Sequence, residues 1–155
     1  MTKKLRIGLF GGSFDPVHIG HVALARSARK EFKLDKVIFI PAKVPPHKLQ
    51  KRLTPANVRL KMLSAAIKPY KKFLISRYEI DRKPPTYTYQ TVAHFKRFYP
   101  GSKLFFIIGM DSFVELKTWK KIDTLMGQLQ FIAGKRHGVS VRPGLPFRES
   151  VKVPL

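Results

Sequence analysis

Short apolar runs alternate along the chain with segments in which apolar residues recur three and four positions apart. Five runs are rich in Ile, Val and Phe, a composition typical of strands buried on both faces. The runs cover residues 6–10, 37–42, 73–80, 104–109 and 129–134. Between them the helical spacing predicts helices around residues 24–32, 58–67, 92–99 and 112–126, with a break in the last near Trp119.

Strand–helix alternation of this kind predicts an α/β fold, a Rossmann-like doubly wound parallel sheet in a single domain over residues 1–155. Ligands of such sheets bind at the carboxyl ends of the strands. Thr54-Pro55 is expected to cap the second helix, with the proline at its first position. Residues 135–155 contain three prolines and two glycines, which favours a loop, and VKVPL at 151–155 is expected to form a last strand.

The chain has no cysteine, which excludes disulfides, thiolate nucleophiles and cysteine–zinc sites and suits a reducing compartment. Its most apolar run, residues 104–110, is far shorter than the roughly 20 residues of a membrane helix. We therefore expect a soluble, cytoplasmic protein with no membrane partner.

The net charge is unusual, since 31 Lys and Arg against 9 Asp and Glu give +22. Such a field attracts nucleotides, nucleic acids and lipid headgroups alike, so a solvated basic surface and a polyanion-binding role both stay open. The basic residues are dispersed, and neither aromatic RNA-binding strands nor zinc spacings occur. Any nucleic-acid binding is expected to be nonspecific.

The stretch GGSFDPVHIGH at 11–21 follows the first predicted strand. It matches neither GxGxxG nor the Walker loop. Gly11 and Gly12 let the backbone approach a ligand closely, and Ser13 adds a hydroxyl donor. Asp15-Pro16 is expected to start the helix that follows.

His18 and His21 lie three residues apart, which places both imidazoles on one face near the start of this helix, with Gly20 leaving the surface between them bare. A helix amino terminus attracts anions, so the pair predicts a site for a phosphate chain. Two alternatives stay open. A zinc pair would need a further ligand, and the chain offers neither a cysteine nor HExxH; or the two histidines merely cap and pack the helix.

Further motifs each have a structural and a functional interpretation. The segment 43–52, KVPPHKLQKR, is a basic connector or an anion-binding loop. In YEIDRKPPTYT, Thr86 or Thr88 is placed to cap the next helix, whose amino terminus also suits a carboxylate. Asp111 after IIGM caps a helix or binds ribose hydroxyls, and Trp119 packs in the core or forms a stacking platform.

Together these motifs resemble a known family. GGSFDPVHIGH is similar to the signature of the HxGH nucleotidyltransferase superfamily, and its fuller form to nicotinate mononucleotide adenylyltransferases. VPPHK, YEIDRKPPTYT, IIGMDSF and TW then match in order. The resemblance implies transfer of AMP from ATP to nicotinate mononucleotide, which gives deamido-NAD and pyrophosphate, with Mg²⁺ expected to accompany ATP.

The resemblance also implies roles for individual residues. His18 and His21 would be catalytic and hold the triphosphate. The expected ATP-binding residues are Gly11, Gly12, Ser13, Phe14, His18, His21, Gly109 and Asp111. The expected residues for the mononucleotide are His47 and Lys48 at its phosphate, and Thr86, Thr88, Trp119 and Lys120 at its nicotinate. Relatives usually carry Tyr where this chain has Lys120.

Two further points follow from the resemblance. A related transferase for another phosphate, such as phosphopantetheine, is the alternative within the superfamily, and the TYT and TW motifs argue against it. Relatives carry a Ser-Ser-Thr…Arg motif that grips the ATP phosphates, and it would be expected after VKVPL, where this sequence stops. That predicts weak ATP binding and low turnover. The sequence indicates no oligomeric state.

Overall fold

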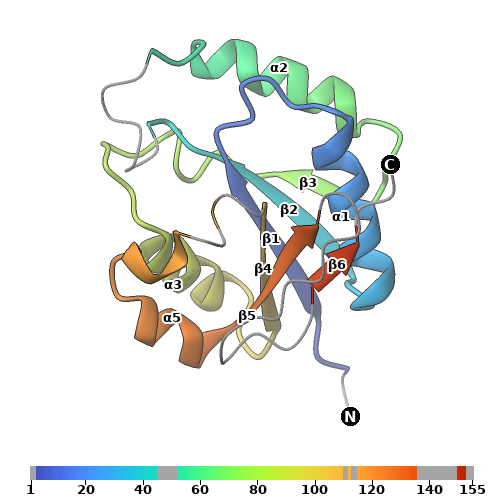
Figure 1. The fold of residues 1–155 in the computed structure, drawn as a ribbon, viewed down its shortest axis with the longest axis vertical. Coiled ribbons are helices and arrows are strands. Elements are labelled where there is room, and N and C mark those ends of the chain that lie inside the picture. The colour runs from blue at the N-terminus through green and yellow to red at the C-terminus, as the bar shows by residue number, and fades with distance from the viewer. Residues whose placement is uncertain (1–2, 45–51, 110–111, 113–114, 136–149, 153–155) are drawn as a thin grey trace.

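One parallel sheet organises the molecule (Figure 1). The computed structural model describes residues 3–44, 52–109, 112, 115–135 and 150–152. The strands are β1 (Arg6–Gly12), β2 (Lys36–Pro41), β3 (Phe73–Ile75), β4 (Lys103–Ile108), β5 (Gln130–Lys135) and β6 (Ser150–Lys152). They lie in the order β3-β2-β1-β4-β5-β6, and every neighbouring pair is parallel. The predicted doubly wound parallel sheet is confirmed.

Helices cover both faces of the sheet. α1 (Ile19–Glu31) and α2 (Ala56–Ile67) lie on one side, and α3 (Thr88–Phe98) and α5 (Ile122–Gln128) on the other, as Figure 1 shows. A short 3₁₀ turn, η2 (Leu116–Thr118), precedes α5. The last predicted helix is therefore interrupted at Trp119, as its pattern indicates.

Alternation along the strands builds two separate cores. Phe10, Phe39 and Phe105 point to the face covered by α1 and α2. Leu9 and Phe106 point to the face covered by α3 and α5. Because successive strand residues face opposite ways and both faces are covered, the strands are apolar at nearly every position.

β1 lies in the middle of the sheet between β2 and β4. The strand order reverses here: the chain adds strands on one side of β1 as far as β3 and then continues on the other side with β4. At such a reversal, called a switch point, the loops after two adjacent strands leave in opposite directions and open a crevice at the carboxyl ends of the strands. Ligands of these folds bind in that crevice. Gly12 at the end of β1 marks that place.

The predicted strand over 73–80 is wrong beyond Ile75. β3 is an edge strand whose register with β2 ends at Phe39, and the chain then turns, with the amide of Asp81 donating to the carbonyl oxygen of Arg77. Tyr78 and Glu79 pack on α3 instead of joining the sheet, which explains an apolar pattern without a strand.

Two helix starts also differ from expectation. α1 begins at Ile19 with His18 at the N-cap, so Asp15-Pro16 lies in the turn before the helix. α2 begins at Ala56 with Pro55 at the N-cap. Thr54 therefore lies one residue too early to cap, and its own amide donates to Oδ2 of Asp15 at 2.9 Å.

The last strand, predicted over residues 151–155, is present as β6 at residues 150–152, parallel to β5, and residues 153–155 lie outside the described residues. The rest of the loop expected between them, residues 136–149, lies outside the described residues. Among the helices that the structure describes, none has the length and apolar character to cross a membrane.

Candidate functional site

The turn after β1 packs closely against the sheet. A Cβ on Gly11 would lie 2.9 Å from Cζ of Phe106 on the neighbouring strand, so only glycine fits there without moving that ring. Gly12 is exposed at the strand end, as a ligand-facing backbone requires. Phe14 has a φ of 47°, in the left-handed region that a bulky residue seldom adopts, and its side chain is buried. Gly11 therefore has a packing role that sequence reasoning missed.

His18 and His21 form one compact unit at the start of α1. Their rings stack with centroids 3.8 Å apart. Nδ1 of His18 accepts the amide hydrogen of Gly20 at 3.1 Å, and Nδ1 of His21 accepts that of His18 at 3.1 Å. A ring nitrogen that accepts carries no hydrogen, so the hydrogen of each ring lies on Nε2. The pair both caps the helix and presents two Nε2–H donors.

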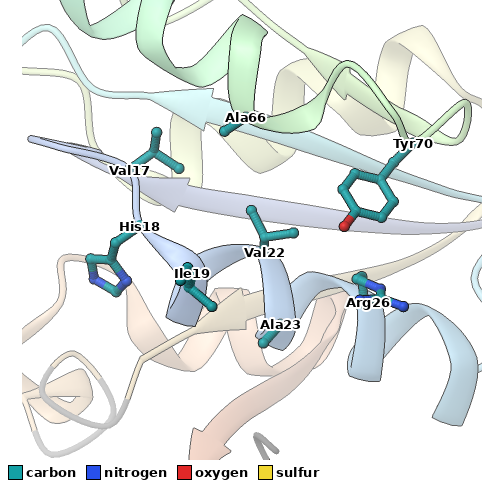
Figure 2. Close-up of a pocket in the computed structure, with 8 residues that line it drawn as sticks. All are labelled: Val17, His18, Ile19, Val22, Ala23, Arg26, Ala66 and Tyr70. Carbon is teal, nitrogen blue, oxygen red and sulfur yellow. The ribbon is translucent and has the colours of Figure 1, made fainter. Parts of the chain in front are cut away.

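The sequence predicted that Gly20 leaves the surface between the two histidines bare, whereas the structure places the His18 ring over Gly20 and stacks it on His21. A Cβ at this position would lie 2.9 Å from Cε1 and 3.0 Å from Nδ1 of His18. The ring of His18 thus lies directly over the backbone of Gly20. Figure 2 shows His18 projecting beyond the first turn of α1, while Val17 and Val22 face the groove beside α2. That groove has a volume of about 440 Å³.

A second group of predicted residues meets where α3 begins. Nζ of Lys120 lies 4.6 Å from the centre of the Tyr87 ring, which brings the segment after η2 against the start of α3. Trp119 is half-buried and meets Phe106 and Phe131 edge-on, with ring centroids 6.0 and 6.1 Å away. Trp119 therefore packs against the core, and this packing fixes where any stacking platform would lie.

The threonine caps were predicted wrongly. The N-cap of α3 is Tyr87, so Thr86 lies before it and Thr88 is the first helical residue. The amide of Tyr87 donates to Oε1 of Gln90, which supplies the cap from within the helix. Thr86 is 6% exposed, and its hydroxyl has no hydrogen-bond partner among the described residues. A buried hydroxyl without a partner is costly unless a ligand or water satisfies it.

The two groups of residues share one neighbour. Phe106 of β4 packs against the backbone at Gly11 and against the ring of Trp119. Because β1 and β4 are adjacent at the switch point, the glycine turn and the Trp119 segment flank the same crevice. Gly109 follows β4 directly and is exposed. His47, Lys48 and Asp111 lie outside the described residues.

Sequence reasoning missed Glu79, which fastens the turn between β3 and α3 onto α3. Oγ1 of Thr91 donates to Oε2 of Glu79 at 2.8 Å. Burial raises the pKa of Glu79 to about 7, against the opposing effects of that bond and of Arg82. Beside it the rings of Tyr78 and His94 stack with centroids 4.0 Å apart. Burial, with Arg97 and Arg82, lowers the pKa of His94.

Arg59 was also missed, although a signal existed. It lies on α2 four and eight residues before Leu63 and Ile67, the two apolar residues that this helix buries, so it shares their inward face. An arginine on the buried side of a helix needs acceptors there. It is 1% exposed.

The described residues contain no group of three or more His, Cys, Asp or Glu able to hold a metal ion. Nδ1 of each stacked histidine accepts a backbone hydrogen, so only the Nε2 atoms can face a ligand. Their donors suit a ligand that accepts hydrogen bonds, such as a chain of phosphates.

Comparison with known proteins gives a consistent result. The model of the family described as cytidylyltransferase-like matches residues 9–153. A "Probable nicotinate-nucleotide adenylyltransferase" of Clostridium tetani is 42% identical over 91% of this chain and 69% of its own length. A protein with the same description from Moorella thermoacetica is 46% identical over 94% of this chain and 70% of its own.

Solved structures agree on the fold. The Plasmodium falciparum nicotinic acid mononucleotide adenylyltransferase complexed with NaAD superposes with a TM-score of 0.80 at 19% identity, over 97% of this chain and 76% of that one. The same enzyme complexed with APC gives 0.77 at 18% identity, with the same coverage. At such low identity the likeness shows the fold alone.

Proposed function

Because this chain belongs to the cytidylyltransferase-like family, we propose that it is a nicotinate-nucleotide adenylyltransferase, which transfers AMP from ATP to nicotinate mononucleotide. The products are deamido-NAD and pyrophosphate. The observation that carries the choice of reaction is the histidine pair, whose Nε2–H donors stand at the start of α1 beside the switch point. The relatives at 42% and 46% identity carry the choice of acceptor.

The proposed step is a direct displacement. An oxygen of the mononucleotide phosphate attacks the α-phosphorus of ATP, and the bond from that phosphorus to the bridging oxygen of the β-phosphate breaks. The electron pair leaves with pyrophosphate. The attacking phosphate is already ionised, so no protein nucleophile and little proton transfer are needed, and catalysis rests on positioning and charge stabilisation.

His18 and His21 are placed for that charge stabilisation. Their Nδ1 atoms are occupied by the amides of Gly20 and His18, so neither ring turns freely. Donors fixed before the reaction need no reorganisation when charge gathers on the triphosphate, and one such donor typically contributes roughly 10²–10³ in rate. The amino terminus of α1 adds its partial positive charge.

The mononucleotide is proposed to lie on the other side of Phe106, near the start of α3. Thr86 offers a buried hydroxyl there, and Lys120 offers a cation over the Tyr87 ring. A helix amino terminus and a cation both favour the nicotinate carboxylate over the neutral amide of nicotinamide. His47, Lys48 and Asp111 are proposed to contact the substrates on the strength of the family resemblance alone.

We propose that Mg²⁺ enters with ATP as part of the substrate. The described residues offer no cluster of ligands for a resident ion, and Mg²⁺ commonly binds through substrate phosphates. Since the reaction draws on ATP, we place the enzyme in the cytoplasm.

A turnover assay tests the proposal. ATP is offered with nicotinate mononucleotide, nicotinamide mononucleotide or phosphopantetheine in separate reactions, and pyrophosphate release is measured. The nicotinate compound is expected to give the highest kcat/KM. A higher kcat/KM with phosphopantetheine would show that the protein is a transferase for that acceptor. If no acceptor gave pyrophosphate release, the proposed activity would be overturned.

A further inference from the structure

Arg59 joins three segments of the chain that are distant in sequence. Its Nε donates to the carbonyl oxygen of Thr54 at 2.8 Å. Its Nη1 donates to the carbonyl oxygens of Ser13 at 2.8 Å and Ala42 at 2.7 Å, and its Nη2 donates to that of Lys43 at 3.1 Å. One guanidinium thus holds the turn after β1, the end of β2 and the residues before α2.

Only arginine can make this set of bonds. The guanidinium is planar and carries five donors in a fixed fork, whereas a lysine ammonium is a single centre with three. Burial lowers the pKa of Arg59 from its ordinary value, while the nearby Asp15 opposes that effect. Asp15 adds a second link between the same segments, because its Oδ2 accepts the amide hydrogen of Thr54.

The clamp brackets Phe14, one of three non-glycine residues with a positive φ in the described part of the chain. Phe14, with its φ of 47°, lies between Ser13, which Arg59 holds, and Asp15, which Thr54 holds. A left-handed conformation at a bulky residue persists only where the surroundings impose it. Ser13 is tied to α2 through Arg59, and Asp15 is tied to Thr54 just before α2, so the clamp supplies that restraint.

Phe14 in turn supports the histidine pair. Its ring meets His21 edge-on, with centroids 5.1 Å apart, and meets Phe10 at 5.3 Å. His21 stacks on His18. A continuous line of contacts therefore leads from the guanidinium of Arg59 through Ser13 and Phe14 to both imidazoles.

We propose that Arg59 is a positioning residue for catalysis, which holds the Ser13–Asp15 turn so that the Phe14 ring fixes the His18–His21 pair. This proposal goes beyond the nucleotide-binding role of the histidines and rests on the proposed function for its kinetic consequences. The structural consequences of the proposal, the positions of the two imidazoles, hold whether or not the proposed function is correct. Arg59 is 1% exposed, so it acts on the histidines through the Ser13–Asp15 turn.

Arg6, at the start of β1, is a suitable control, because the turn that Arg59 holds lies at the other end of that strand. Arg6 also donates through Nε to a backbone carbonyl, that of Phe32 at 2.9 Å, and its guanidinium lies 4.8 Å from the centre of the Phe105 ring. Arg6→Lys makes the same chemical change as Arg59→Lys at the amino end of β1, away from the switch point. If Arg59 only stabilised the fold by bonding backbone carbonyls, as Arg6 does, both variants would behave alike.

The first measurement needs no activity. The Cε1–Hε1 signals of the imidazoles are recorded by ¹H–¹³C NMR in the wild type and in both variants, with assignments from His18→Gln and His21→Gln. In Arg59→Lys the signals of His18 and His21 are expected to shift and broaden, and in Arg6→Lys to stay in place. Unchanged signals in a folded Arg59→Lys would overturn the proposal even if the wild type proved inactive.

The second measurement separates kcat from KM. Arg59→Lys is expected to lower kcat by about 10- to 100-fold, the scale of loss for a small misplacement of catalytic groups. The fall in kcat is expected to exceed any rise in KM for nicotinate mononucleotide, because the histidines act on the transition state, whereas Arg59 meets the segment of His47 and Lys48 only at the flanking Lys43 and Thr54. Should Arg59→Lys not fold, Phe14→Leu keeps the clamp and removes the ring, and a wild-type kcat in that variant would equally overturn the proposal.

Discussion

The rings of His18 and His21 stack 3.8 Å apart, and each uses its Nδ1 to accept a backbone hydrogen at the first turn of α1. Capping and anion binding are therefore not alternatives at this site. The hydrogen bonds that cap the helix also fix the tautomer and the orientation of the Nε2–H donors. A substitution that preserves the cap and removes the donor can separate the two roles.

His18→Asn makes that separation. The asparagine oxygen takes the place of Nδ1 and is a preferred N-cap acceptor, so the free energy of unfolding should stay within about 0.5 kcal/mol of wild type, whereas His18→Ala should lose about 1 kcal/mol. Both variants lose Nε2–H, so turnover should fall roughly 10²–10³-fold in each. Urea unfolding and a pyrophosphate-release assay measure the two effects. Near-normal turnover in His18→Asn would reduce His18 to a capping residue.

Gly20→Ala should stabilise α1 and lower turnover. Alanine is favoured over glycine in helices by up to about 1 kcal/mol, so stability should hold or rise. The added Cβ would lie 2.9 Å from Cε1 of His18 and push the ring aside, so turnover should fall about tenfold or more, as for other misplaced catalytic groups.

Gly127→Ala in α5 is the matched control for that variant. A Cβ on Gly127 meets nothing within 4 Å, so this variant should gain stability and keep its turnover. Equal turnover in the two alanine variants would show that the His18 ring has room to move, and that Gly20 serves no purpose at the site.

The sequence predicted well where burial decides the structure. Strands covered on both faces must be apolar throughout, and β1, β2, β4 and β5 were predicted within two residues of their bounds. It failed where apolar residues pack outside the sheet: Tyr78 stacks on His94 of α3, so the run after Ile75 looks like a strand and is a turn.

At the site, the position of His18 and His21 on one face near the start of a helix was predictable, because it depends on spacing within one helical turn. The spacing on α2 indicates that Arg59 faces inward, but neither its acceptors nor the partner of Glu79 was predictable, because they lie on other segments of the chain. The carbonyl oxygen that Arg59 holds at Ser13 is 46 positions away. The Thr91 hydroxyl bonded to Glu79 lies 12 positions away, across the start of α3. No local pattern announces such partners.

Glu79 should make stability depend on pH between its unfolded and folded pKa values. The folded pKa is about 7, raised from 4.5 chiefly by burial, so in that window the native state binds more protons than the unfolded chain. Stability is therefore highest below pH 4.5 with respect to this group and declines as the pH rises to about 7, by up to about 3 kcal/mol.

Glu79→Gln should remove that decline, because the amide keeps an acceptor for Thr91 and does not ionise. Urea unfolding at pH 5 and pH 8 should show a smaller difference for Glu79→Gln than for wild type. Asp81→Asn, at the exposed acid paired with Arg77 in the same turn, should leave the difference unchanged. An identical pH dependence in wild type and Glu79→Gln would contradict the assignment.

Lys120 should contribute to the choice of nicotinate over nicotinamide. Its Nζ lies over the Tyr87 ring at the start of α3, where the carboxylate is proposed to bind. Lys120→Gln should lower the ratio of kcat/KM for the nicotinate compound to that for the nicotinamide compound by about two- to fivefold, the scale of an exposed ion pair. Lys121→Gln removes the same charge from a lysine held 4.6 Å from the Tyr89 ring in the same manner. Lys121→Gln should leave the ratio of kcat/KM values unchanged.

The effect of Lys120→Gln on that ratio should become smaller in high salt, because exposed charges are screened. If both variants lowered the ratio equally, the preference would come from the general positive field of the protein, and Lys120 would have no part in recognising the carboxylate.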